Sequence, residues 1–86
     1  MKLTFDEPGT FNALYAAERW CDHNGYSRGS TDRSGVIGLM KGNYDIAKWH
    51  NLTKQERRAC DGVMTGDFRE GPVTVHLYEE GEKRLT

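Results

Sequence analysis

The residues best suited to chemistry are the three histidines, the two cysteines and the acids around them. His50 stands between Trp49 and Asn51 at an expected strand-to-helix turn, and such turns often carry function. An imidazole acts as a general base only when a neighbouring group holds and tunes it, and the local sequence offers His50 no such neighbour. No set of Ser, His and Asp has the local pattern of a nucleophilic site. We therefore expect no enzymatic activity and assign no catalytic residue.

A metal site would have to be assembled from Cys21, His23, His50 and Cys60. Their pattern, C-x-H followed by a distant H-x9-C, matches none of the common zinc spacings. We therefore expect no metal and no cofactor. The two cysteines are predicted to be reduced core residues, and a disulfide would require two predicted helices to pack side by side.

The glycine-rich stretch at residues 28–42, RGSTDRSGVIGLMKG, is a further candidate, because glycines let backbone N–H groups converge on a phosphate. The nucleotide-binding pattern G-x-x-x-x-G-K-[ST] is absent from it. A G-x-x-G is present, but its middle residues Val36 and Ile37 are apolar, unlike the exposed pair of an RNA-binding KH loop. We therefore predict a loop over residues 25–34 and a buried strand over residues 36–41.

The net charge of −1 hides an uneven distribution. Residues 1–18 hold one Lys against three acids, residues 19–58 hold eight Lys or Arg against four acids, and residues 59–86 hold three against six. The segments therefore carry −2, +4 and −3. A basic middle can present a positive face to a polyanion. Alternatively, the acidic ends fold back and neutralise it.

The first 25 residues predict a strand, a turn and a helix. Leu3 and Phe5 alternate with polar residues in KLTFDE, which is typical of a half-buried strand. Thr10 is the expected N-cap of a helix over residues 11–23. The apolar stripe of this helix is formed by Phe11, Leu14, Ala17 and Cys21.

The rest of the chain predicts two more strands around a second helix. Gly42-Asn43 joins the strand at 36–41 to an alternating strand at 44–49. Thr53-Lys54-Gln55-Glu56 is a capping box that starts the second helix. The residues expected to face inward from this helix are Ala59, Cys60, Val63 and Met64. A strand over residues 73–78 closes the fold.

These elements predict the α+β class, as a two-layer sandwich in β-α-β-β-α-β order. This is the ferredoxin-like order, with both helices on one face of a mostly antiparallel sheet. Residues 1–80 are expected to form a single domain and residues 81–86 a frayed tail. The chain shows no signal-peptide pattern and no apolar window of membrane-spanning length. A soluble cytoplasmic protein without a membrane partner is therefore expected.

RNA-recognition modules share this element order and stack bases on aromatic residues of the third strand. Aligned on Lys41, the corresponding stretch reads K-G-N-Y-D-I-A-K. The three aromatic positions are occupied by Asn43, Asp45 and Lys48, and a carboxylate there would repel phosphates. We do not assign this family.

The stretch I-A-K-W-x-N-L-T-x-x-E-R, followed by D-G-V-M-x-G and G-P-V-x-V, covers residues 46–75. It resembles a pattern in small phage- and prophage-encoded proteins of unknown function. The resemblance implies an accessory protein that acts on a host or defence component, and it carries over no functional residue.

The expected function is a non-enzymatic binding module whose partner is a host or defence protein in the host cytoplasm. Aromatic and arginine side chains are enriched at interface hot spots. The residues expected to bind are Tyr26, Arg28, Arg33, Tyr44, Lys48, Trp49, His50, Arg57 and Arg58. The alternative is a nucleic-acid binder that uses the basic segment 19–58, including Lys41 and Lys54, on phosphates. The oligomeric state is not predicted.

Overall fold

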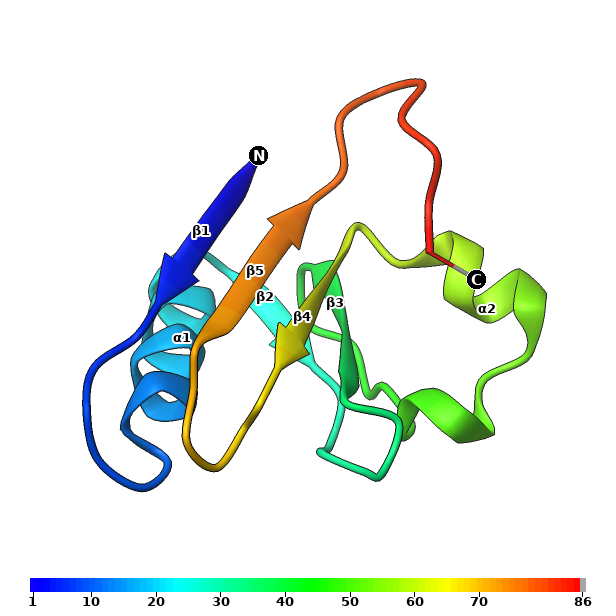
Figure 1. Ribbon diagram of the computed structural model, residues 1–86. Coiled ribbons are helices and arrows are strands. Elements are labelled where there is room, and N and C mark those ends of the chain that lie inside the picture. Colours follow the sequence, from blue (N-terminus) through cyan, green and yellow to red (C-terminus); the bar gives the residue numbers. More distant parts are fainter. Residues whose placement is uncertain (86) are drawn as a thin grey trace.

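The computed structural model describes residues 1–85 and shows a five-stranded antiparallel sheet with one long and one short α-helix (Figure 1). The strands lie in the order β1-β5-β4-β3-β2, so the last four form a meander and the first pairs with the last. The elements are β1 (Lys2–Phe5), α1 (Asn12–His23), β2 (Tyr26–Arg28), β3 (Val36–Lys41), the 3-10 helix η1 (Trp49–Asn51), α2 (Lys54–Ala59), β4 (Gly62–Gly66) and β5 (Val73–Leu77).

The α+β class and the antiparallel sheet are therefore confirmed. The expected β-α-β-β-α-β order is also present along the chain, with one additional strand before the end. Register places Ile37 opposite Met64, and Met64 opposite Val75, so these side chains share one face of the sheet.

That face carries the main core and is covered by α1. Ile37, Leu39, Met64, Val73 and Val75 are each at most 1% exposed. Leu14, Ala17 and Cys21 of α1 belong to the same apolar cluster. Their spacing gives α1 one apolar stripe, which is the physical reason why this helix lies flat on the sheet.

The opposite face of β3 and β4 is also apolar, and a second cluster forms there. Trp49, Cys60 and Val63 are buried in it, with Val36 and Met40 partly buried beside them. The expectation that both helices share one face is wrong. The connection from β3 to β4, residues 42–61, covers this second face through Trp49 and Cys60. Helix α2, which buries no residue of its own, lies beyond the strands on that side (Figure 1).

Three local predictions of secondary structure are also wrong. Residues 44–49 were expected as a strand and have no strand structure, because both edges of β3 are already paired with β2 and β4. The predicted loop over 25–34 contains β2, which takes one of those edges. The second helix ends at Ala59, because Cys60 is extended, and Gly62–Gly66 forms β4. A side chain at Gly62 would strike the His76 carbonyl, so this strand passes β5 too closely for any residue but glycine.

Of the two predicted helix starts, one is confirmed and the other is wrong. The capping box is confirmed, because the Thr53 hydroxyl accepts from Glu56 N–H at 3.1 Å and Glu56 Oε1 accepts from Thr53 N–H at 2.8 Å. Thr10 is not the N-cap of α1. Phe11 holds that position with φ of 63° and no side-chain capping bond, and its ring is 39% exposed instead of facing the core.

The chain beyond β5 returns towards the start of β4. Arg84 donates hydrogen bonds to the carbonyls of Arg58, at 3.0 Å, and Cys60, and Leu85 N–H donates to the Tyr78 hydroxyl at 3.0 Å. The tail predicted over 81–86 includes Thr86, which lies outside the described residues. Within residues 1–85, no helix is both long and apolar enough to cross a membrane.

Candidate binding site

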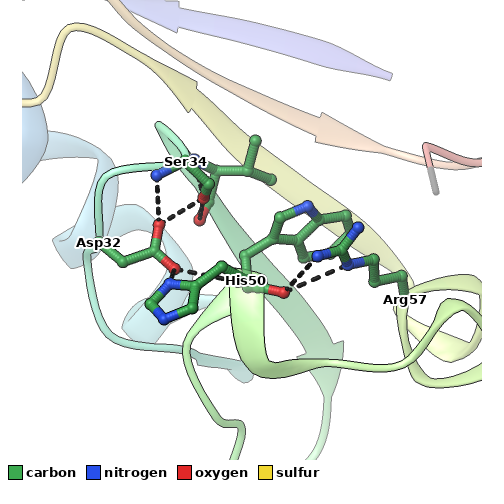
Figure 2. Close-up of polar contacts among 6 residues, drawn as sticks. Asp32, Ser34, His50 and Arg57 are labelled. Atoms are coloured by element: carbon green, nitrogen blue, oxygen red, sulfur yellow. Dashed lines mark hydrogen bonds and ion pairs between the residues drawn. The ribbon is translucent and has the colours of Figure 1, made fainter.

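Asp32 is the centre of a polar cluster that joins the β2–β3 loop to η1 (Figure 2). Its Oδ1 accepts hydrogen bonds from the Ser34 N–H at 2.7 Å and from the Ser34 hydroxyl. Its Oδ2 accepts from the His50 N–H at 3.0 Å and lies 2.7 Å from His50 Nδ1. The Asp32 side chain is only 2% exposed, whereas the His50 side chain is 54% exposed. The carboxylate thus pins η1 against the loop and leaves the imidazole at the surface.

These bonds also fix the charge of Asp32 and the hydrogen positions on His50. They hold the pKa of Asp32 well below its usual range, with the Ser34 hydroxyl having the largest effect and the His50 N–H the next. An ionised carboxylate can only accept hydrogen bonds, so Nδ1 of His50 carries a hydrogen. The structure thus gives His50 a hydrogen-bonding partner, Asp32, that the local sequence does not indicate. Its free ring nitrogen is Nε2.

Asp32, Ser34 and His50 are the residue types of a nucleophilic triad, but they are connected differently. In a triad the imidazole takes the serine proton while the carboxylate holds the imidazole. Here the Ser34 hydroxyl donates to Asp32 and accepts from Val36 N–H at 3.2 Å. Within residues 1–85 Ser34 makes no hydrogen bond to His50. This arrangement anchors a loop and does not activate a serine.

Trp49 and Arg57, both predicted to contact a partner, make contacts within the connection itself. Trp49 is 5% exposed and packs in the second apolar cluster. The Arg57 guanidinium donates to the Trp49 carbonyl from Nε at 3.2 Å and from an Nη at 3.0 Å, and lies 5.2 Å from the Trp49 ring centre (Figure 2). Arg57 therefore ties α2 to η1.

The other cations of this region are exposed. We define the cationic surface as Arg33, Lys48, His50, Lys54 and Arg58. Lys54 and Arg58 are four residues apart and so lie on one side of α2. Within the described chain, none of the four Lys and Arg side chains forms an ion pair.

Three carboxylates near this surface accept backbone hydrogen bonds, whereas Asp45, also on the connection, is exposed and makes no hydrogen bond or ion pair within residues 1–85. Asp32 is held by Ser34 and His50, as described. Glu56 accepts the Thr53 N–H, which lowers the pKa of Glu56. Asp61 accepts the Lys41 N–H at 2.7 Å. Backbone N–H groups thus hold these three acids in place, and within residues 1–85 none of them forms an ion pair with the Lys and Arg side chains of the cationic surface.

A depression of about 420 Å³ lies within this surface, lined by Arg33, Ser34 and His50. Two predicted binding residues thus meet there, although 17 positions separate them in the sequence. Ser34 also lines the depression, but its hydroxyl already donates its hydrogen to Asp32. Arg33 and His50 are therefore the side chains that can contact a ligand.

The remaining predicted residues lie elsewhere. Arg28 pairs with Glu18 at 3.2 Å and Asp22 at 3.1 Å on α1, so its charge is neutralised on the opposite face. Tyr26 stacks on Trp20 on that same face. Tyr44 is 55% exposed in the turn after β3.

The two cysteines lie in different clusters on opposite faces of the sheet. Both are free and buried. Burial raises the pKa of Cys21 to about 11 and also raises the pKa of Cys60. Among residues 1–85 no group of three or more His, Cys, Asp or Glu gathers as metal ligands.

A larger groove, of about 500 Å³, lies on the open face of β4 and β5 under the C-terminal segment. Its lining residues are Val63, Thr65, Thr74, His76, Tyr78, Lys83, Arg84 and Leu85. His76 and Arg84 already have partners here, whereas Lys83 forms no hydrogen bond or ion pair within residues 1–85. His76 Nε2 lies 2.5 Å from Glu82 Oε2, and Arg84 binds backbone carbonyls. The groove is therefore less suited to a charged ligand than the depression beside His50.

Comparison with known proteins gives no match to a family model, to a curated protein or to a solved structure. The site is therefore argued from this chain alone. Sequence reasoning missed Asp32 and Ser34. Their D-x-S pattern is typical of a local turn, but it does not indicate a bond to His50, which is 18 residues away.

Proposed function

We propose that this protein is a non-enzymatic binding module whose cationic surface contacts an acidic surface of another protein. The observation that carries this proposal is a set of four Lys and Arg side chains, three on the anchored connection and Arg33 on the β2–β3 loop, that form no ion pair within residues 1–85. Asp32 holds η1 to the loop and Arg57 holds α2 to η1. A preorganised charged surface loses little conformational entropy on binding, and its field speeds association with an oppositely charged partner.

The partner belongs to the host cell or to a defence system in this proposal. Residues 46–75, which resemble the small phage-encoded proteins, include η1, α2 and four of the five members of the cationic surface. A phage-type accessory role in the host cytoplasm is part of the proposal.

Nucleic acid is the second candidate, because the same cations suit phosphates. Single-stranded binding also draws on exposed aromatic side chains that stack on bases. Trp49 is buried, and in the region of the connection that the structure describes only Tyr44 is an exposed aromatic residue. The protein partner is therefore favoured.

The two candidates separate in an affinity capture from a bacterial lysate, with and without nuclease. The bait is the protein itself, compared with Lys48→Glu/Lys54→Glu. The control, Arg19→Glu/Arg69→Glu, makes the same charge change at exposed positions on α1 and on the β4–β5 turn. We expect to capture a partner protein whether or not nuclease is added. The control bait should still capture this partner, and the Lys48/Lys54 variant should not. Capture that nuclease abolishes would instead support the nucleic-acid candidate.

A further inference from the structure

We propose that the depression between Arg33 and His50 is an oxyanion subsite, and that its occupation requires a proton on Nε2 of His50. The inference rests on the proposed function in one respect only: the oxyanion is taken to be a carboxylate or phosphate group of the partner protein. The geometry of the subsite is independent of that partner.

The first step concerns the hydrogen on His50. A neutral imidazole has a single N–H. The ionised Asp32 carboxylate, 2.7 Å from Nδ1, holds that hydrogen on the Nδ1 side. The neutral ring therefore presents a lone pair at Nε2, and a lone pair repels an oxyanion.

The second step concerns the protonated ring. When His50 takes up a proton, Nε2 becomes a charged donor while Nδ1 keeps its bond to Asp32. The side chain is half exposed and lines the depression, so this donor is accessible. Hydrogen bonds from charged donors to anions are about twice as strong as neutral ones.

The third step adds Arg33. Its side chain lines the same depression and forms no ion pair within residues 1–85. A guanidinium presents several N–H donors in a fixed fork that matches the oxygens of a carboxylate or phosphate. An oxyanion can therefore bridge Arg33 and Nε2.

The charged groups around His50 are few. Asp32 and Arg33 face it from the β2–β3 loop, and Lys48 precedes it on the connection. Arg57 of α2 reaches only the carbonyl of the adjacent Trp49. The lowered pKa of Asp32 keeps that carboxylate ionised over the whole neutral range, and among side-chain types imidazole is in general the one that can gain a proton near neutral pH.

The test uses sulfate as the probe, because sulfate stays dianionic from pH 5.5 to 8.0. Binding is followed by NMR at the His50 ring and the Arg33 side chain. We expect saturable shifts at both residues and an affinity at least tenfold higher at pH 5.5 than at pH 8.0. His50→Gln should abolish the pH dependence, and Arg33→Ala should weaken binding at both values. The matched control, His23→Gln, alters an exposed histidine at the end of α1 and should change nothing.

Two results would overturn the inference. One is equal affinity at both pH values. The other is a set of small shifts spread over all basic residues, because that is general ion condensation. A parallel titration with acetate at pH 5.5 identifies the source: comparable shifts with acetate favour an acidic side chain, and sulfate alone favours a phosphate group. No partner is needed, so failure here leaves the proposed function intact, and failure of the lysate capture leaves the subsite intact.

Discussion

Arg57 provides the sharpest test of how the connection is held. Replacing it with alanine removes the two N–H donors 3.2 and 3.0 Å from the Trp49 carbonyl. Because they share one acceptor, we count them as a single charge-assisted bond, worth about 1.5–3 kcal/mol. The contact with the Trp49 ring, 5.2 Å from its centre, adds about 0.5–1 kcal/mol. The guanidinium is only partly buried and water can replace some of this, so we expect Arg57→Ala to cost about 2 kcal/mol.

For a domain of this size, about 2 kcal/mol lowers the melting temperature by roughly 8–16 °C. Urea unfolding followed by tryptophan fluorescence and circular dichroism measures the free-energy change directly. Arg57→Lys is the matched control, because it keeps the charge but loses the fork, and it should recover less than half of the loss. An Arg57→Ala variant that unfolds like the parent protein but fails to bind a partner would refute the reasoning, since Arg57 would then be a contact residue.

Three further predictions concern other parts of the chain. Phe11 occupies a left-handed conformation, which costs roughly 1–2 kcal/mol for a residue with a side chain. Phe11→Gly should therefore keep or raise the free energy of unfolding by up to about 1 kcal/mol after the entropy of glycine is counted, and a clear loss in urea unfolding would show that the exposed ring contributes to packing. The pKa values of Asp32, through the Ser34 hydroxyl, and of Glu56, through the Thr53 N–H, are lowered in the folded state. Their stabilisation is therefore present above the unfolded pKa, about 4, and is lost as pH falls below it. Asp32→Asn should flatten the dependence of unfolding free energy on pH between pH 5 and 2, and profiles of equal slope would contradict this. Burial raises the pKa of Cys21 to about 11 and raises that of Cys60. Iodoacetamide at pH 8 should thus modify both thiols only in urea, whereas rapid labelling of the native protein would count against the two buried positions.

The parts of the fold that sequence predicts are those set by neighbours along the chain. The capping box at Thr53 and the alternation of Val73, Val75 and Leu77 need only local chemistry, and both are confirmed. The limits of β4 depend on packing against a distant strand. The sequence predicts Val63 and Met64 on the second helix, but both belong to β4, whose Gly62 permits the close approach to His76.

In the candidate site, too, some features follow from the local sequence and others from tertiary contacts. Sequence composition indicates a basic middle segment, and the exposed Arg33, Lys48 and Arg58 belong to it. It does not show that Arg28 is neutralised by α1 or that Trp49 is buried, because both follow from tertiary contacts. The bond between Asp32 and His50 is likewise set by where the loop meets η1.

The central claim is that the cationic surface makes the contact with an acidic partner. The most direct measurement is the dissociation constant of the captured and purified partner, taken at a series of salt concentrations for the parent protein, Lys48→Glu/Lys54→Glu and Arg19→Glu/Arg69→Glu. Screening weakens contacts between exposed charges as salt rises. We predict that the parent protein and the control lose affinity together with salt, and that the Lys48/Lys54 variant binds at least tenfold more weakly at low salt with little further change. Equal affinity of the Lys48/Lys54 variant and the parent protein at low salt would contradict the account.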